Sequence, residues 1–150
     1  MYDTVFSGDG RLIATVSHDN TARVLDSATG VFVGTPFLHS APVSSVQFSP
    51  NGGEVLTAGF DGGVRIWSLS NSSGSRLMVR HLETVLHAAF NADGSRILFC
   101  SHDGTACLWD AKTGVLLTDT LRHDGLISFA AYVSNQAEIL TVSWDGMVRL

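Results

Sequence analysis

Serine, histidine and aspartate recur together along this chain of 150 residues. In a hydrolase an aspartate orients a histidine, and that histidine is the base that activates a serine hydroxyl. Segments 17–19 and 101–103 both read Ser-His-Asp. Histidine and aspartate are also common zinc ligands, so the same residue types could hold a metal ion. A hydrolase-like enzyme is therefore one alternative for the function of this chain.

A constant spacing of 42 residues argues against a single catalytic site. It relates the aspartates at positions 19, 61, 103 and 145, and the histidines at positions 39, 81 and 123. A catalytic set is needed once, whereas a set that recurs at a fixed step belongs to a repeated structure. The three histidines also fall in separate repeat units, which does not suit a shared metal ion. We therefore expect no catalytic residue, no cofactor and no metal ion.

Each repeat unit has the pattern of short strands joined by tight turns. In the second unit, residues 43–48 alternate, and residues 55–58 are nearly all apolar, as in a strand covered on both faces. The Asp61-Gly62 pair then supplies the positive φ of a tight hairpin, and a third strand ends at Trp67. Four strands per unit are expected, because a weaker fourth strand fits at 32–34, 77–79 and 116–118.

A sheet of four short strands cannot cover both of its own apolar faces, so neighbouring units must stack against it. At these residues the sequence resembles the WD-repeat (WD40) family over its whole length, with the Trp-Asp dipeptide intact at 109–110 and altered at 25–26 and 67–68. The resemblance implies an all-β fold, an incomplete WD40-type β-propeller of three to four four-stranded antiparallel blades. The expected units are approximately 1–38, 39–80, 81–122 and a truncated 123–150.

The resemblance also implies a buried hydrogen-bonded tetrad in each blade. Its members are a histidine before the first strand, a serine or threonine on the second, the hairpin aspartate and the tryptophan of the third. One blade has every member, and the blade before it has Gly59 at the serine position, so stability is expected to vary between blades. The expected tetrad residues are His81, Ser101, Asp103 and Trp109; His39, Asp61 and Trp67; Ser17 and Asp19; and His123, Ser143 and Asp145.

The residue before each hairpin aspartate varies along the chain, and the resemblance places this position on the top rim of a propeller. Aromatic groups there would supply contact area for a partner, since such residues are enriched in interface hot spots. The alternative is packing against the next blade. The candidates are His18, Phe60, His102 and Trp144, with Pro42, Ser44, Leu86 and Leu126 added by register.

Composition narrows the classes of partner. Nine basic against fourteen acidic residues give a net charge of -5, and no basic cluster is present, so no nucleic acid is expected as a ligand. The arginines at 23, 65 and 149 share one strand column and are expected to be solvated. No apolar run is long enough to span a membrane. Two cysteines, Cys100 and Cys107, fit free thiols in a reducing, intracellular or cytoplasmic setting.

These observations favour a protein-protein interaction scaffold or adaptor that binds other proteins or peptides and is a fragment of a larger WD40-repeat protein. Two alternatives stay open. One is the hydrolase-like β-propeller enzyme, and the other is a half-propeller that oligomerises to close a ring. Exposed blade edges and faces predict self-association in both the scaffold and the half-propeller.

Overall fold

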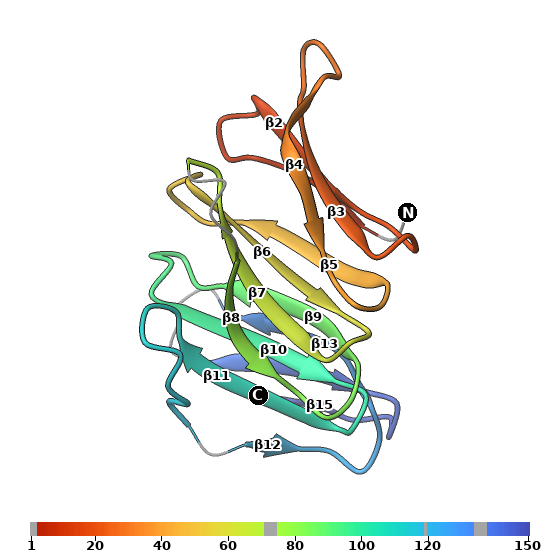
Figure 1. The fold of residues 1–150 in the computed structure, drawn as a ribbon. Helices are drawn as coiled ribbons and strands as arrows, with labels where there is room; N and C mark the ends of the chain where they lie inside the picture. The colour runs from red at the N-terminus through yellow and green to blue at the C-terminus, as the bar shows by residue number, and fades with distance from the viewer. Residues whose placement is uncertain (1–2, 71–74, 119, 134–137) are drawn as a thin grey trace.

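The computed structural model describes residues 3–70, 75–118, 120–133 and 138–150. These residues form four antiparallel sheets that follow one another in chain order, from the red sheet to the blue one in Figure 1. They include no α-helix, and so no helix long and apolar enough to cross a lipid bilayer. The expected all-β fold, an incomplete WD40-type propeller, is confirmed.

The first two sheets each have four strands. They are β1 (Asp3–Phe6), β2 (Leu12–Val16), β3 (Thr21–Asp26) and β4 (Phe32–Leu38), then β5 (Val43–Phe48), β6 (Glu54–Gly59), β7 (Gly63–Ser68) and β8 (Ser75–Arg80). The third sheet has β9 (Val85–Phe90), β10 (Arg96–Ser101), β11 (Thr105–Asp110) and β12 (Leu121–Arg122), and the fourth has β13 (Ile127–Tyr132), β14 (Ile139–Ser143) and β15 (Val148–Arg149). Each sheet therefore lies within one of the units expected from the sequence.

The hairpin between the second and third strand of each sheet requires a left-handed residue. In the second sheet this residue is Gly62, with φ of 71°, and a Cβ there would collide with the carbonyl oxygen of His81 in the next loop. The first sheet has Asn20 instead, with φ of 69°. Asparagine tolerates this region better than most residues with a side chain, so the hairpin keeps its shape without glycine.

The aspartate of the Trp-Asp position, which follows Leu25 in the first unit and Trp109 in the third, explains the turn after the third strand. Asp26 accepts hydrogen bonds from the Thr29 amide and hydroxyl at 2.8 and 2.9 Å, and Asp110 accepts from the Thr113 amide and hydroxyl at 2.7 and 2.8 Å. These bonds satisfy backbone donors that the turn would otherwise leave without a protein partner. The aspartate of the dipeptide is therefore a turn residue, one step beyond the buried network of its blade.

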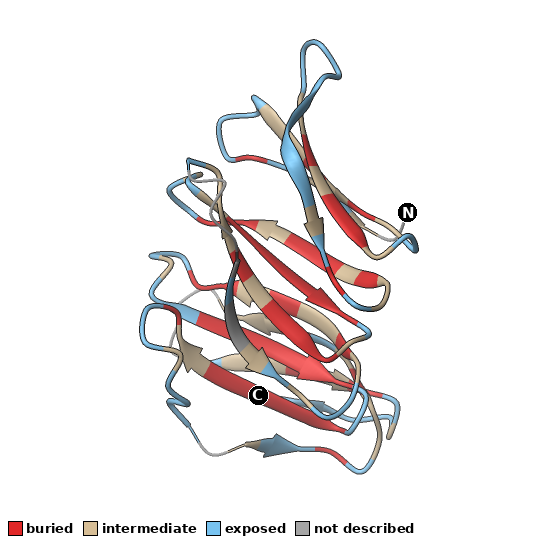
Figure 2. Cartoon of the chain, in the orientation of Figure 1, coloured by how far each residue is buried: buried red, intermediate tan, exposed pale blue. Residues whose placement is uncertain are grey.

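The core lies between the sheets, and the second strand of each blade is its most buried part. Figure 2 shows buried residues along the middle strands and exposed residues on β4 and the turns. In the second and third sheets, every residue of β6 after Glu54 and of β10 after Arg96 is buried. This agrees with the continuous apolar runs at 55–58 and 97–100. Blades are thus held by their neighbours more than by their own two faces.

The outermost strand is where the sequence interpretation was least accurate. In the third sheet, the strand expected at 116–118 is wrong: Leu116 makes only an isolated bridge with Trp109, and the strand β12 lies at 121–122. Leu116 and Leu117 are exposed. Because an outer strand pairs on one side and buries little, its register is weakly fixed by the hydrophobic pattern.

Candidate functional site

A complete hydrogen-bonded network fastens the second sheet, and it contains a threonine. The Trp67 indole Nε1–H donates to Thr57 Oγ1 at 2.8 Å, and Thr57 Oγ1 lies 2.8 Å from His39 Nε2. His39 Nδ1 lies 3.1 Å from Asp61 Oδ1. If the Thr57 hydroxyl donates to Nε2, His39 is neutral and its Nδ1–H donates to Asp61. One chain of donors then runs from the tryptophan to the aspartate.

Asp61 ties this network to the loop before the blade. It accepts from the Ser40 and Gly63 amides at 3.0 and 2.9 Å and pairs with Arg65 at 2.9 Å. Burial would raise the pKa of Asp61, but hydrogen bonds from Arg65, the Ser40 amide and His39 outweigh burial and hold it well below its ordinary range. The Arg65 side chain is only 18% exposed, so its expected solvation was wrong.

The serine column predicted for the tetrad was wrong by two residues. Ser101 Oγ donates to the Thr84 carbonyl at 2.9 Å, and Ser143 Oγ donates to the Gly125 carbonyl at 3.0 Å. In the first sheet, Ser17 Oγ accepts from the Asp19 amide at 3.3 Å. Because side chains two apart share one face of a strand, the pattern could not separate the two columns. A signal was present, since threonines at 15, 57 and 141 share the 42-residue step.

The third sheet, in which every tetrad member was expected, has a broken network. Phe99 occupies the position of Thr57, and the buried atoms His81 Nδ1 and Trp109 Nε1 make no hydrogen bond. His81 Nδ1 is 3.4 Å from the Asp103 carboxylate, and His81 Nε2 is 3.2 Å from Thr105 Oγ1. The Phe99 ring packs edge-on to His81, with centroids 5.8 Å apart. Aromatic packing by Phe99 thus stands in place of the hydrogen bonds that Thr57 makes in the second sheet.

The fourth sheet repeats the histidine part of the network. His123 Nδ1 and Nε2 lie 2.9 Å from Asp145 Oδ2 and from Thr141 Oγ1. Burial opposes ionisation of Asp145, but hydrogen bonds from the Met147 amide and His123 lower its pKa to about 2. In the first sheet, Asp19 accepts from the Thr21 hydroxyl at 2.7 Å. Each hairpin aspartate therefore fastens its own turn.

The repeated polar residues do not form an open catalytic cleft in the described part of the chain. The side chains of His39 and His123 are 0% and 1% exposed, and their ring nitrogens contact protein groups. Across the described ranges, no three histidine, cysteine, aspartate or glutamate side chains gather as a metal-ligand set. A substrate would have to displace core packing to reach either imidazole. The geometry therefore indicates a structural role for these residues, which hold each sheet together by hydrogen bonds.

The predicted rim residues lie on one side of the molecule. In the second, third and fourth sheets the hairpin is tied to the loop that precedes its blade, by backbone bonds from Phe60 to Pro42 at 2.9 Å, from His102 to Thr84 at 3.0 Å and from Trp144 to Leu126 at 3.0 Å. Loops and hairpins therefore alternate along a single rim. The residues before the hairpin aspartates, His18, Phe60, His102 and Trp144, are all exposed, whereas Pro42, Ser44, Leu86 and Leu126 are half-buried.

The contacts of Ser44 and the exposure of Leu82 differ from what the sequence led us to expect of the rim. Ser44 Oγ is 2.6 Å from the Val85 carbonyl and 3.0 Å from the Ala58 carbonyl, so its hydroxyl joins two blades. Leu82, which was not among the predicted residues, is 99% exposed in the loop before the third blade. Its column holds Ser40 and Asp124 in the neighbouring units, and an apolar residue in a polar loop column was the available signal.

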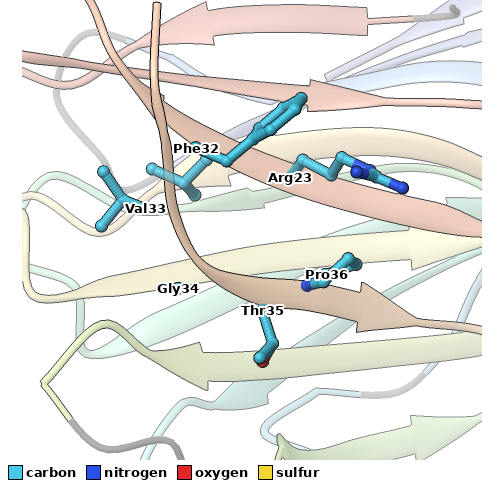
Figure 3. A pocket seen from close by; sticks show the side chains of 7 residues that line it. Arg23, Phe32, Val33, Gly34, Thr35 and Pro36 are labelled. Atoms are coloured by element: carbon cyan, nitrogen blue, oxygen red, sulfur yellow. The ribbon is translucent and has the colours of Figure 1, made fainter.

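A separate shallow pocket of about 170 Å³ lies on the first sheet, away from the rim loops (Figure 3). It is formed where Gly34, with φ of 74°, bends β4 next to β3. The Arg23 guanidinium lies 5.1 Å from the centroid of the Phe32 ring, a cation–π distance. Arg23 is equivalent in the repeat to Arg65, which pairs with Asp61 in the second sheet. Arg23 instead lines this pocket, so the two arginines have different environments.

The buried histidine predicts acid sensitivity. Burial lowers the pKa of His39 below its ordinary 6.5, and burial does the same for His87. Below about pH 6.5 the unfolded chain therefore binds more protons than the folded one, and stability should fall as the pH is lowered from 7 to 5. The low pKa of Asp61 adds its own loss only at more acidic pH.

Urea unfolding of the wild type and of His39→Gln at pH 7 and pH 5.5 would check this expectation. The variant should be less stable at pH 7, because its network is broken, and it should lose less stability between the two pH values. His87 remains in the variant and keeps part of the slope. An unchanged pH dependence in His39→Gln would show that His39 is not the titrating group.

Comparison with known proteins agrees with the geometry. A family model described as "WD domain, G-beta repeat" matches residues 2–26, 30–68 and 74–110. The chain is 33% identical over 66 residues to "Transcriptional corepressor LEUNIG_HOMOLOG" of Arabidopsis thaliana, covering 44% of this chain and 8% of that protein. It is 41% identical over 69 residues to "WD repeat and HMG-box DNA-binding protein 1" of Xenopus laevis, covering 46% of this chain and 6% of that protein.

A third similar protein is "COMPASS component SWD3" of Saccharomyces cerevisiae, which is 32% identical over 79 residues, covering 51% of this chain and 24% of that protein. The chain thus spans only 6% to 24% of the length of these relatives. Because the family model covers more than half of its residues, the chain belongs to the WD40 (WD domain, G-beta repeat) family.

Proposed function

We propose that this chain is a protein-interaction module whose rim of loops and hairpins binds other proteins or peptides. The supporting observation is that each hairpin fixes its aspartate by hydrogen bonds within the turn and presents the preceding residue to solvent. Trp144 is 77% exposed and Phe60 is 41% exposed on the same rim. A rigid turn that presents a large side chain loses little entropy on binding.

The relatives fit this role, and they also fit a part of a larger protein. Two are named as a transcriptional corepressor and as a COMPASS component. One is named as DNA-binding and carries an HMG-box in its name, but this chain spans 6% of it. In the present chain the rim loops and hairpins hold six acidic residues and no lysine or arginine. We therefore propose protein ligands, no nucleic acid, no catalytic role and an intracellular setting with Cys100 and Cys107 as buried thiols.

Peptides selected from a displayed random library on the wild-type chain provide a probe for the rim. Phe60→Ala should weaken a selected rim-binding peptide by about 2 kcal/mol, with the melting temperature nearly unchanged. Leu116→Ala is the matched control, because Leu116 is also 41% exposed but lies outside the rim. Binding is measured by calorimetry and stability by thermal unfolding. Equal losses of affinity in both variants, or lost stability with intact binding in Phe60→Ala, would contradict the proposal.

A further inference from the structure

Hydrogen bonds from side chains join the first strands of consecutive sheets. The strands β5, β9 and β13 lie side by side (Figure 1). Asp3 Oδ2 accepts from the Val46 amide at 3.2 Å, and Gln47 Oε1 accepts from the Phe90 amide at 2.6 Å. In both bonds the donor amide follows the acceptor by 43 residues. A side chain of one first strand therefore satisfies a backbone amide at the edge of the next sheet.

The junction between the third and fourth sheets lacks the counterpart of the Gln47 bond. Ala89 stands 42 residues after Gln47, and Tyr132 stands 42 residues after Phe90. Tyr132 and Phe90 pair with equivalent residues of their second strands, so the Tyr132 amide also points away from its second strand. The methyl group of Ala89 has no acceptor to offer this amide. The partner of the equivalent amide in the preceding junction is a carboxamide.

A cavity of about 500 Å³ lies at this junction. It is formed between the first strands of the second, third and fourth sheets, where the small side chains of Ala89, Ala130 and Ala131 leave room for it. Pro50 and Ala92, from the turns after the first strands, also line it, so it lies at the opposite end of the sheets from the rim. All its lining residues fall between positions 47 and 132, so its composition does not depend on the ends of the chain.

The polar groups of the lining favour a neutral ligand. In the described part of the chain, the buried atoms His87 Nδ1 and Tyr132 Oη have no hydrogen-bond partner, and both residues line the cavity. Such atoms carry a desolvation penalty that a bound polar group would relieve. Gln47 has an NH2 group to donate, because its oxygen already accepts from Phe90. Among the described lining residues none is a lysine or arginine, so a carboxylate would be desolvated without a counter-charge.

We propose that this cavity binds a neutral carboxamide, the side chain of a glutamine or asparagine of a partner protein. Its carbonyl oxygen accepts from the Tyr132 amide, as the Gln47 oxygen accepts from the Phe90 amide in the preceding junction. Its NH2 group faces the His87 and Tyr132 side chains that line the cavity. This site is separate from the rim and does not rest on the function proposed for the rim.

A nuclear magnetic resonance titration of the full, ¹⁵N-labelled chain tests the ligand class. Propionamide carries the same group as a glutamine side chain and should shift the Tyr132 amide signal saturably at concentrations on the order of millimolar. Propionate has the same shape and a negative charge, and it should leave that signal in place. The peptide acetyl-Gly-Gln-Gly-amide should saturate at a lower concentration than propionamide. An unmoved Tyr132 signal or an equal response to propionate would overturn the carboxamide site, and a peptide no better than propionamide would overturn the assignment to a protein side chain.

Two substitutions at position 89 locate the site. Ala89→Gln supplies the carboxamide from within the chain, so it should abolish the response to propionamide and slow hydrogen exchange of the Tyr132 amide about tenfold. Ala89→Met is the matched control, because methionine has the same length without the carbonyl oxygen. It should also abolish the response, but it should slow the exchange much less. A response retained in Ala89→Gln, or equal exchange rates in the two variants, would overturn the proposal.

Two further measurements keep the test decisive. If Ala89→Gln fails to fold, the wild-type titration with propionamide and propionate still decides the ligand class. Phe60→Ala should keep the full response to propionamide, because Phe60 lies on the rim at the other end of the sheets. A response lost in Phe60→Ala would overturn a separate site, whereas failure of the rim to bind peptides leaves the response unchanged.

Discussion

Replacing Thr57 by valine should destabilise the fold by about 2 to 4 kcal/mol, because the change keeps the shape of the side chain and removes its hydroxyl. Thr57 is fully buried, and its oxygen accepts from Trp67 and lies beside His39. Valine leaves two buried polar atoms without a partner, each of which carries a desolvation penalty. Urea unfolding followed by tryptophan fluorescence would measure the loss.

Ser101→Ala is the informative comparison for Thr57→Val. Ser101 is also fully buried, but its hydroxyl donates to the Thr84 carbonyl at 2.9 Å and accepts only a long bond, of 3.4 Å, from the Asp103 amide. Its loss should cost about 1 kcal/mol. A larger loss of stability in Thr57→Val than in Ser101→Ala is expected from the observed network, in which the threonine is central. The network implied by the resemblance has the serine in that role. A larger loss in Ser101→Ala than in Thr57→Val would restore the serine column as the fastening position.

A second large effect is expected at the junction between the second and third sheets. At the first junction, Phe37 stacks on Trp67 with centroids 4.7 Å apart, beside the small Thr57. At the next junction, 42 residues on, the small Val79 and the large Phe99 pack in one core with Trp109. Large and small residues have exchanged sides. Phe99→Thr alone should cost about 3 to 5 kcal/mol, since it opens a cavity.

The double variant Val79→Phe with Phe99→Thr should recover at least about 2 kcal/mol relative to the sum of the single changes. Phenylalanine at 79 refills the space, and threonine at 99 offers a hydrogen-bond partner to Trp109 Nε1, which has none in the described structure. A double-mutant cycle by urea unfolding measures the coupling. Val79→Phe with Leu98→Ala is the control, because Leu98 packs on the opposite face, in the core below the fourth sheet. Additive effects in the first pair would contradict the size exchange.

The periodic features of the fold could be predicted from the sequence, and the features that depend on contacts between units could not. The hairpin aspartates and the buried second strands follow from local turn chemistry and apolar runs, which act within a few residues. The choice between Thr57 and the Gly59 column depends on where the Trp67 indole reaches, which is set by tertiary packing. Phe99 reads as an ordinary core residue until its neighbours are known.

The rim shows the same division between local and tertiary information. The exposure of Phe60 and Trp144 agrees with their place beside a tight hairpin. The register also placed Ser44 on the rim as a candidate for partner binding, but its hydroxyl lies between the Ala58 and Val85 carbonyls. Leu82 was missed because its loop has no regular pattern of apolar residues. The position of a residue in the repeat therefore predicts where its backbone lies. The residues packed around it determine whether its side chain is exposed to a partner.

The exchange of Phe37 and Thr57 for Val79 and Phe99 has a consequence for how these repeats can change. Each side chain is sized for a partner in the adjoining unit, so a unit copied or moved beside a different neighbour would bring two bulky or two small residues face to face. Substitutions at these positions are then constrained in pairs, with one residue of each pair on either side of the boundary between two units. A chain with rearranged repeats would need compensating substitutions at the junctions between its units before its rim could bind a new ligand.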